Sequence, residues 1–392
     1  MADLHIGLLW HPAASSNLGM GALSAGNLAL ARAAAAQAGL TADFTIISAR
    51  DPGPPAVAGE RLSQSNITGR YMVSPGGFLA DARRCDIMLD ISGGDSFTDI
   101  YPNKRFAYIS STKILTILCG TPLVLSPQTI GPFSRQPHSA IAAWICRHAS
   151  ALFVRDELSL AALGTLAPGV AARQVVDVAF ALPFTPAPRQ TTGRLQIGLN
   201  VSGLLMNGGY AGNNQYGLGF DYPVLTHRLI EALLARGDCD IHLVPHVIAP
   251  HMPVDDDGAA ANQLKARYPA LHRHPDFTSP SAAKSFISGM DFLVGARMHA
   301  TIGAFSSGVP VVPVSYSRKF EGLFGSLGYD WLVRRDMATD AALARILTAL
   351  DQRAALAADI ARAAPLIQAG LADYVDALAT LFTTAAQKRR PR

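Results

Sequence analysis

The sequence predicts an α/β protein of two doubly wound domains, each with a parallel sheet, that face each other across a cleft. Its 392 residues correspond to about two domains at roughly 100–200 residues each. Short apolar runs alternate with longer helical patterns in both halves, as in βαβ units. Residues 183–193 hold three prolines and little apolar content, so we place a linker there. We expect an N-terminal domain at 1–185 and a C-terminal domain at 186–392.

The first half opens with an apolar strand at 5–10, a loop of small residues and an alanine-rich helix at 22–38 that ends at Gly39. Glycine at this place accepts the left-handed conformation that commonly closes a helix. The later apolar runs are unbroken, as expected for a parallel sheet covered on both faces. Further strands are predicted at 43–48, 86–91, 122–126 and 151–154, and further helices at 106–118 and 139–148.

The second half repeats the alternation and ends in a long helical region. From 339 to 385 the chain is rich in alanine, and we expect this region to be divided near Pro365, because proline interrupts a helix. Strands are predicted at 195–200, 240–244, 291–294 and 310–314, and helices at 222–236, 259–268 and 300–307.

Composition excludes several classes of protein. Hydrophobic residues make up 49% and charged residues 16% of the chain, which is typical of a folded protein rather than a disordered one. The net charge of +4 is spread over both halves, so neither is a basic nucleic-acid module. The cationic end at 388–392 is predicted to be a solvated tail, with a weak peripheral contact with an anionic membrane surface as the alternative.

The cysteines and the apolar runs indicate a cytoplasmic protein. Cys85, Cys119, Cys146 and Cys239 are too far apart for a metal knuckle or a CxxC redox pair, so we expect buried thiols in a reducing compartment. No signal-peptide pattern opens the chain, and the apolar run at 114–126 is too short for a transmembrane segment.

Loops that follow strands hold the candidate site of the first domain, because ligands of doubly wound sheets bind beyond the carboxyl ends of the strands. Gly93 and Gly94 allow close backbone approach, and Asp95 and Ser96 can cap the next helix. This loop either holds an anion or a sugar hydroxyl or is simply a tight turn. Gln128, with its neighbour Thr129, is expected to face the cleft, again unless the loop is only a turn.

Arginine and histidine mark the corresponding loops of both domains. Arg155 ends a strand and can bind a carboxylate or phosphate, or pair with an acidic neighbour at the surface. Arg297 and His299 lie in a turn from strand to helix, where a fixed cation and a group that exchanges protons near neutral pH suit acid catalysis on an anionic substrate. The acidic run at 255–257 near His246 matches no zinc or calcium template and is expected to be a solvated loop, with His246 as a candidate acceptor contact.

Taken together, these segments resemble the polysaccharide pyruvyl transferase family from about residue 15 to 332. The resemblance implies the GT-B-like arrangement of two Rossmann-like domains, with the acceptor on the N-terminal side and the donor on the C-terminal side. The segments that carry it are Gly-Gly-Asp-Ser-Phe at 93–97, Gln-Thr-Ile-Gly-Pro-Phe at 128–133, Val-Arg-Asp at 154–156, Asp-Val-Ala-Phe at 177–180, Arg-Met-His-Ala at 297–300, and Gly-Val-Pro at 308–310 continuing to Lys319.

The resemblance implies transfer of a pyruvyl group from phosphoenolpyruvate to a sugar of a cell-surface or exopolysaccharide precursor, with ketal formation and release of phosphate. It implies catalytic roles for His299, Arg297 and Arg155, and donor binding by Arg155, Arg297 and Lys319. No cofactor or metal is expected, and the partner is a glycan or lipid-linked glycan. The implied acceptor-binding residues are Asn17, Gly19, Gly93, Gly94, Asp95, Ser96, Gln128 and His246.

The first loop departs from the family pattern, because Met20 stands where an aspartate is common. Two alternatives therefore stay open: a nucleotide-sugar glycosyltransferase on the same architecture, and a glycan- or anion-binding relative without catalysis. A dehydrogenase is not favoured, because no GxGxxG motif follows the first strand.

Overall fold

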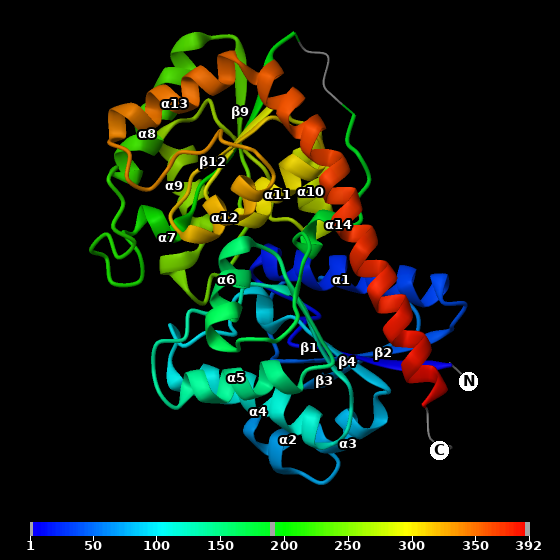
Figure 1. Cartoon of the computed structure of the whole chain (residues 1–392). Helices are drawn as coiled ribbons and strands as arrows, with labels where there is room; N and C mark the ends of the chain where they lie inside the picture. Colours follow the sequence, from blue (N-terminus) through cyan, green and yellow to red (C-terminus); the bar gives the residue numbers. More distant parts are fainter. Residues whose placement is uncertain (1–2, 189–192, 389–392) are drawn as a thin grey trace.

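The computed structural model describes residues 3–188 and 193–388, which form two α/β units lying one above the other (Figure 1). The first unit has a seven-stranded sheet of order β3-β2-β1-β4-β5-β6-β7, and the second a five-stranded sheet of order β10-β9-β8-β11-β12. All pairs of named strands are parallel. The predicted fold class is confirmed.

The strands agree with most of the predicted apolar runs. Those of the first sheet are β1 (Leu4–Leu9), β2 (Ala42–Ser48), β3 (Leu62–Asn66), β4 (Ile87–Asp90), β5 (Leu123–Gln128), β6 (Ala151–Val154) and β7 (Arg173–Gln174). Those of the second sheet are β8 (Leu195–Asn200), β9 (Cys239–Leu243), β10 (His272–Arg273), β11 (Phe292–Gly295) and β12 (Val311–Pro313).

Helices cover both sheets. The first unit contains α1 (Leu18–Gln37), α2 (Gly69–Val73), α3 (Phe78–Arg84), α4 (Asn103–Leu118), α5 (His138–His148), α6 (Glu157–Leu166) and the short 3-10 helices η1 (Ser92–Gly94) and η2 (Val178–Ala181). The second contains α7 (Gly203–Met206), α8 (Tyr222–Arg236), η3 (Pro253–Asp255), α9 (Asp257–Arg267), α10 (Pro280–Ser288), α11 (Met298–Ser306), α12 (Arg318–Ser326), α13 (Thr339–Asp351) and α14 (Arg353–Gln387).

The strand order creates one reversal point in each sheet. β1 lies between β2 and β4, and β8 lies between β9 and β11. Crossovers to opposite sides of the first strand leave a crevice at its carboxyl end, which is where such sheets bind ligands. The loops after β1, β4, β8 and β11 are therefore the places to look for a site.

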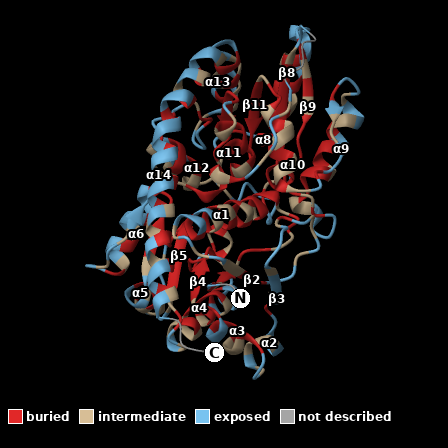
Figure 2. Ribbon diagram, turned by 90° about the vertical axis from the view of Figure 1, so that its right-hand side faces the viewer, coloured by how far each residue is buried: buried red, intermediate tan, exposed pale blue. Residues whose placement is uncertain are grey.

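Helix α1 joins the two units. It begins at Leu18 rather than at the predicted residue 22, because the side chain of Asn17 accepts a hydrogen bond from the N–H of Gly19 and caps the helix. A Cβ at Gly21 would lie 2.7 Å from Cγ of Pro280 in α10, so the absence of a side chain permits this close packing. One hydrophobic cluster continues through this contact into both sheets, and Figure 2 shows the buried residues meeting there.

Helix α14 packs along both units (Figure 1, red). Its course differs from the sequence prediction. The expected division near Pro365 is wrong, because the helix runs through this proline and the break from α13 falls at Gln352. Pro365 lies on the exposed face, while Ile360, Ala363 and Ile367 continue a buried stripe on the other side. Packing of that stripe offsets the backbone hydrogen bond that proline cannot form.

A buried polar network fastens α14 to the first unit. The hydroxyl of Tyr374 hydrogen-bonds to Asn27 Oδ1 and Ser126 Oγ, each at 3.0 Å. The amide of Asn27 also donates to Ser126 Oγ and lies 2.8 Å from His11 Nε2. Burial lowers the pKa of His11 to about 4, which keeps its imidazole neutral and able to accept that bond.

The sequence prediction missed elements that carry little apolar patterning. β3 has mostly exposed and polar residues at the sheet edge, and β7 and β10 have two residues each. α12 begins at Arg318, in a region for which no helix was predicted. These elements are specified by their neighbours in the fold rather than by their own periodicity.

The predicted linker lies partly outside the described residues. Its described beginning is held by α10: the N–H groups of Thr185 and Ala187 donate to Ser285 Oγ and Ser288 Oγ. The sheets divide between Gln174 and Leu195, while α14 returns to the first unit, so the domain limits at 185 and 186 stay a prediction.

Other expectations concern the cysteines and the membrane. The four cysteines are free thiols; three are buried and Cys119 is half-buried. Among the described helices, none combines the length and apolarity that crossing a bilayer requires. The cationic end at 389–392 lies outside the described part of the chain.

The Tyr374 network predicts the effect of a single oxygen. Tyr374→Phe leaves the ring in place but removes a partner of Asn27 and Ser126, and we expect it to lower the free energy of unfolding by about 1–2 kcal/mol. Leu366→Ala, at an exposed position of the same helix, should change it by less than about 0.5 kcal/mol. Urea unfolding measures both, and equal stability of Tyr374→Phe and the wild type would contradict the assignment.

Candidate functional site

The reversal points of the two sheets meet at a backbone seam. Asn17, after β1, forms an antiparallel bridge with Val247, after β9. The N–H of Leu18 donates to the carbonyl of His246 at 3.0 Å, and the N–H of Ile248 donates to the carbonyl of Ser16 at 2.8 Å. The start of α1 is therefore held directly against the loops of the second unit.

His299 lies at this seam, in the first turn of α11. A Cβ at Gly19 would come within 2.3 Å of its Nδ1, so the start of α1 covers one side of the ring. Its buried Nε2 has no hydrogen-bond partner among the described residues and lies 4.0 Å from Asp177 Oδ2. Burial lowers the pKa of His299 to about 4, with Asp177 opposing and Arg155 and Lys319 adding to the shift. An unpaired ring nitrogen here is free to exchange a proton with a ligand.

Arg155 approaches the same carboxylate from the first unit. Its Nη1 donates to Asp177 Oδ2 at 2.6 Å, and its Nε donates to the hydroxyl of Thr129 at 3.0 Å. Both charged groups are almost completely buried. The alternative of a surface pair with Asp156 or Glu157 is therefore wrong.

Arg297 is fixed by two carboxylates that the sequence analysis placed in a solvated loop. Its Nε donates to Asp257 Oδ1 at 3.1 Å, and its Nη2 donates to Asp255 Oδ1 at 2.6 Å and to Asp257 Oδ1 at 2.7 Å. Asp257 is completely buried, so that expectation for 255–257 is wrong. The carboxylates were misjudged because a run of three aspartates has the composition of an exposed loop.

Asp257 also organises the loops around Arg297. Its Oδ1 accepts from the N–H of Gly203 at 2.9 Å, and its Oδ2 accepts from the N–H groups of His246 and Val247 at 3.1 and 3.0 Å. This single carboxylate therefore connects the loops after β8, β9 and β11. An acceptor of this kind keeps a buried guanidinium in one orientation.

His246 is a second histidine without ring partners. Its side chain is buried, and within the described structure neither ring nitrogen is hydrogen-bonded. Burial lowers its pKa to about 3, and the neighbouring His299 and Arg297 contribute to the same shift. Two neutral imidazoles are therefore close enough at the seam to affect each other electrostatically, and both are buried there.

Lys319 forms an ion pair across the two units, with Asp95. Asp95 also accepts a hydrogen bond from the hydroxyl of Tyr101 at 2.8 Å. Burial would raise the pKa of Asp95, but Lys319, Tyr101 and Arg155 together hold it well below its usual range. The neighbouring Arg318 donates to the carbonyl of Gly131 at 3.0 Å, a second link between the units.

Several predicted residues of the first unit shape the site without facing it. Gly93 and Gly94 have φ of 60° and 91°, a turn that favours glycine, and a Cβ at Gly94 would meet Leu23 at 2.5 Å. Ser96 is buried and accepts from Arg105. Neither Asp95 nor Ser96 caps α4, which follows Pro102, so that expectation is wrong.

Gln128 does not face the cleft as expected. It is completely buried, and its amide donates to the carbonyl of Asp90 at 3.0 Å and to Asp90 Oδ2 at 3.2 Å. Asp90 in turn forms a buried ion pair with Lys113 at 2.8 Å. The buried amide of Gln128 is therefore held by Asp90 inside the first unit.

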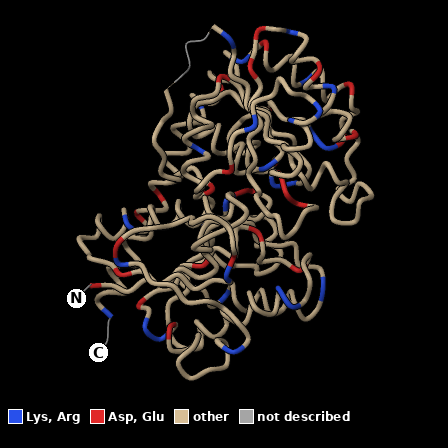
Figure 3. The backbone as a smooth tube through the Cα atoms, turned by 180° about the vertical axis from the view of Figure 1, so that it is seen from behind, with Lys and Arg blue, Asp and Glu red and all other residues tan. Residues whose placement is uncertain are grey.

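The predicted cations are therefore collected at one place but each is paired within the protein. Arg155, Arg297 and Lys319 contact four carboxylates: Asp177, Asp255, Asp257 and Asp95. In Figure 3 acidic and basic residues alternate along the region where the two halves of the tube meet. α11 and α12 begin beside these groups, and no described side chain caps either start. Helix starts of this kind favour an anion.

The most important residue not assigned a role from the sequence is Asp177. It belongs to the 177–180 segment, whose resemblance was noted, and it follows the short strand β7. Its Oδ1 accepts from the N–H of Ala179 at 2.8 Å, which caps η2. A strand of two residues gives no periodic signal, so only the position of the aspartate among known segments could have marked it.

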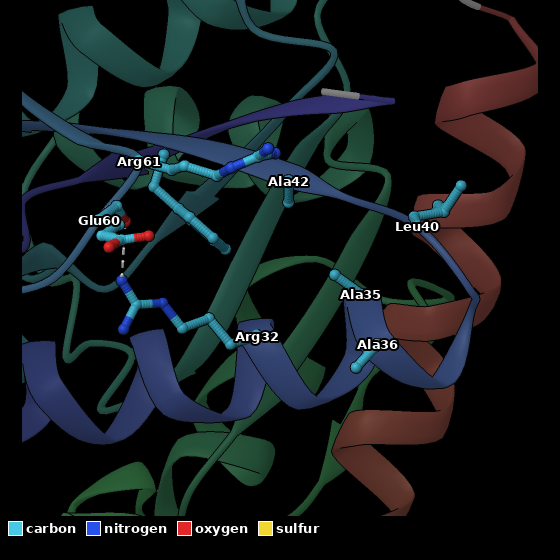
Figure 4. A pocket seen from close by; sticks show the side chains of 8 residues that line it. Arg32, Ala35, Ala36, Leu40, Ala42, Glu60 and Arg61 are labelled. Atoms are coloured by element: carbon cyan, nitrogen blue, oxygen red, sulfur yellow. Dashed lines mark hydrogen bonds between the residues drawn. The ribbon is translucent and has the colours of Figure 1, made fainter. Parts of the chain in front are cut away.

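A cavity lies away from these residues. It has a volume of about 330 Å³ and lies between α1, β2 and the 60–61 segment, with Arg32 and Arg61 among its lining residues (Figure 4). Arg32 is thirteen residues along α1 from Gly19, which is about 20 Å. In the described ranges, no group of three or more His, Cys, Asp or Glu side chains is arranged to hold a metal ion.

Solved structures of low sequence identity share the fold. An α,α-trehalose-phosphate synthase (UDP-forming) from Burkholderia vietnamiensis aligns with a TM-score of 0.56 at 11% identity, covering 98% of this chain and 97% of that one. The S. aureus MnaA–UDP structure aligns with a TM-score of 0.54 at 10% identity, covering 92% and 91%. The spinosyn rhamnosyltransferase SpnG aligns at 0.50 and 13%, covering 96% and 100%. The architecture is that of GT-B glycosyltransferases.

Sequence comparison is more specific. The amylovoran biosynthesis protein AmsJ of Erwinia amylovora is 21% identical over an alignment of 306 residues, which covers 73% of this chain and 70% of that protein. The family model described as polysaccharide pyruvyl transferase matches residues 31–318, a range that includes Arg155, Asp177, Arg297 and His299. Since this match covers most of the sequence, the chain belongs to the polysaccharide pyruvyl transferase family.

Proposed function

We propose that the protein transfers a pyruvyl group from phosphoenolpyruvate to two hydroxyls of a sugar in an exopolysaccharide precursor, forming a ketal and releasing phosphate. The observation that carries the proposal is the buried Nε2 of His299, which has no partner in the described part of the chain and lies beside Asp177, Arg155 and Lys319. A proton-exchanging group among fixed cations suits a reaction that begins with protonation of an anionic donor. The family match and the similarity to an amylovoran biosynthesis protein support the same direction.

Donor binding requires an exchange of ion partners. Phosphoenolpyruvate carries a carboxylate and a phosphate, and Arg155, Arg297 and Lys319 already contact carboxylates of the protein. Lys319 is the most exposed of the three cations, so its pair with Asp95 is the one most accessible to replacement. The donor phosphate takes the place of Asp95, while Asp177 and Asp257 keep the two arginines in position.

The chemical step follows from the position of His299. Its imidazolium gives a proton to C3 of the donor, and a sugar hydroxyl attacks the electron-poor C2. Phosphate leaves as C2–O cleaves, and a second hydroxyl attacks C2 to close the ketal. The proton lost by the first hydroxyl returns to His299, and the proton lost by the second leaves with phosphate. These reaction steps balance without a redox cofactor, and we propose that the reaction needs no metal.

The alternative is a nucleotide-sugar glycosyltransferase, which the GT-B fold itself favours. Met20 supports the other alternative, binding without catalysis. Its Cε would lie 3.1 Å from a Cβ at Gly93, so an apolar group lies beside the Gly93 turn.

We place the reaction in the cytoplasm, with the membrane surface as the site of a lipid-linked acceptor.

Phosphate release separates these functions. The purified chain is incubated with phosphoenolpyruvate and a panel of glycan acceptors in the presence of EDTA, and we expect acceptor-dependent release of phosphate. Thermal unfolding is measured in parallel, and we expect phosphoenolpyruvate to raise the midpoint more than UDP does. Stabilisation by UDP alone would favour the glycosyltransferase, and donor binding without phosphate release would favour the non-catalytic relative.

Two variants should separate chemistry from donor binding. His299→Ala removes the acid and should lower kcat by about 10²–10⁴-fold with little change in KM. Arg297→Lys keeps the charge opposite Asp255 and Asp257 but loses the planar guanidinium group that donates several hydrogen bonds at once. It should raise KM for the donor roughly tenfold. Arg334→Lys, at the exposed Asp330 pair, is the matched control and should leave both constants unchanged. Near-wild-type turnover by His299→Ala would remove this histidine as the acid.

Donor binding should take up a proton at pH 7. The pKa of His299 is about 4 in the free protein, so the ring is neutral, and an adjacent donor anion raises that pKa by favouring the imidazolium. Calorimetry in buffers of different ionisation enthalpy measures the uptake, which we expect to disappear in His299→Gln. Equal uptake by this variant and the wild type would contradict the assignment.

Gly19→Ala tests the position of the imidazole without touching its chemistry. The new methyl group would meet Nδ1 of His299, so the ring must move, and a displacement of about 1 Å can lower kcat up to about 100-fold. Gly164→Ala in α6, where a Cβ meets nothing, is the control and should keep full activity. Wild-type kcat in a folded Gly19→Ala protein would show that the contact is irrelevant to turnover.

A further inference from the structure

Four tyrosines from both units form a rim beside the paired charges. Tyr101 comes from the first unit, Tyr210 and Tyr216 from the glycine-rich segment at 207–220, and Tyr316 from the loop before α12. We call these four residues the tyrosine rim. The proposed chemistry uses none of them.

The rim is tied to the same carboxylates that hold the cations. The hydroxyl of Tyr210 donates to Asp255 Oδ2 at 3.0 Å, and Asp255 Oδ1 accepts from Arg297. Tyr101 donates to Asp95, the partner of Lys319. On each side of the seam, a single carboxylate therefore links a tyrosine to a candidate donor cation.

Contacts among the rings extend the rim into one surface. Tyr216 and Tyr316 meet edge to face with centroids 5.1 Å apart, and Tyr316 packs on Phe320 at 5.5 Å. Tyr101 is close enough to Tyr316 for their hydroxyls to interact electrostatically. All but Tyr210 are half-buried, and Tyr210 is 56% exposed, so ring faces remain open to a ligand.

Apolar side chains and free space adjoin this surface. Ile100 beside Tyr101 is 62% exposed, and Met252, in the same turn as Asp255, is 40% exposed. A second cavity, of about 220 Å³, is lined by Tyr216 together with Leu218 and Phe220. Tyr216 therefore borders free space that it shares with Leu218 and Phe220.

We propose that the tyrosine rim seats the acceptor sugar, whose pyranose ring lies with its CH face against Tyr216 and Tyr316. Its hydroxyls reach the carboxylates of Asp255 and Asp95, each of which has acceptor capacity beyond its present bonds. An aromatic face bordered by acceptors matches a ligand that is apolar on its ring face and rich in O–H donors at its edge. The inference rests on the proposed function in taking this sugar as the acceptor.

Charge favours a neutral sugar over a nucleotide at the rim. Both ligands can stack on tyrosine, but the phosphates of a nucleotide would also approach the carboxylate of Asp255 beside Tyr210. A neutral glycan has no such repulsion. The rim also differs from the acceptor residues predicted from sequence, of which Ser96, Gln128 and His246 are buried.

Saturation-transfer NMR without donor tests the inference. The probes are the methyl glycosides of galactose, glucose and mannose, and the proteins are the wild type, Tyr216→Ala and Tyr316→Ala. We expect transfer to ring CH protons of at least one glycoside and a weakening of its affinity by about two- to tenfold in each variant. Tyr316→Phe should retain binding, and Tyr268→Ala, at a half-exposed tyrosine that bonds Glu231, is the control.

The outcomes separate this inference from the proposed function. Absence of transfer from all three glycosides, or equal affinity in Tyr216→Ala, Tyr316→Ala and the wild type, overturns the tyrosine rim as the sugar seat. Tyrosine-dependent binding without release of phosphate from phosphoenolpyruvate keeps the rim and removes the transferase. Phosphate release with an acceptor KM that is unchanged in both alanine variants keeps the transferase and removes the rim.

Discussion

The site depends on the buried carboxylate of Asp177. It binds Arg155 at 2.6 Å, caps η2 and lies 4.0 Å from the unpartnered nitrogen of His299 on the other unit. A carboxylate placed between a guanidinium and an imidazole stabilises the charged form of both, so it opposes the burial that otherwise keeps His299 neutral. Without Asp177, Arg155 would be a buried cation without a counter-ion and the histidine would lose its nearest negative charge.

The same principle extends to the other cations. Asp257 and Asp255 hold Arg297, and Asp95 holds Lys319 across the seam. These internal carboxylates keep cations in a buried place in the absence of substrate, since unpaired charges there would be costly. They also reduce the free energy of donor binding, because an anionic donor has to replace a carboxylate that already pairs with the cation. The Lys319–Asp95 pair is more exposed than the pairs of Arg155 and Arg297, and it joins the two units. Its replacement by the donor would therefore change the contact between the units.

The sequence predicted the parts of the fold that depend on local pattern. Apolar runs located nine of the twelve strands that the described residues form, and loops after them held Arg155, Arg297 and His299. It could not predict which side chains turn inward. Gln128 is buried because its amide donates to Asp90 inside the sheet, and Asp257 is buried as a counter-ion of Arg297. The helix break at Pro365 was wrongly predicted, because only the packing of α14 shows that this proline faces the solvent. The tyrosine rim comes from three segments about one hundred residues apart in the sequence, which no local pattern connects.

A crystal structure of the protein with phosphoenolpyruvate would locate the donor relative to His299. We expect the donor at the seam, with its anionic groups bound by Arg155 and Lys319, the Lys319–Asp95 pair opened, and C3 within about 3.5 Å of Nε2 of His299. A donor bound away from the seam, or bound there with C3 beyond reach of His299 while the Lys319–Asp95 pair remains intact, would contradict this expectation.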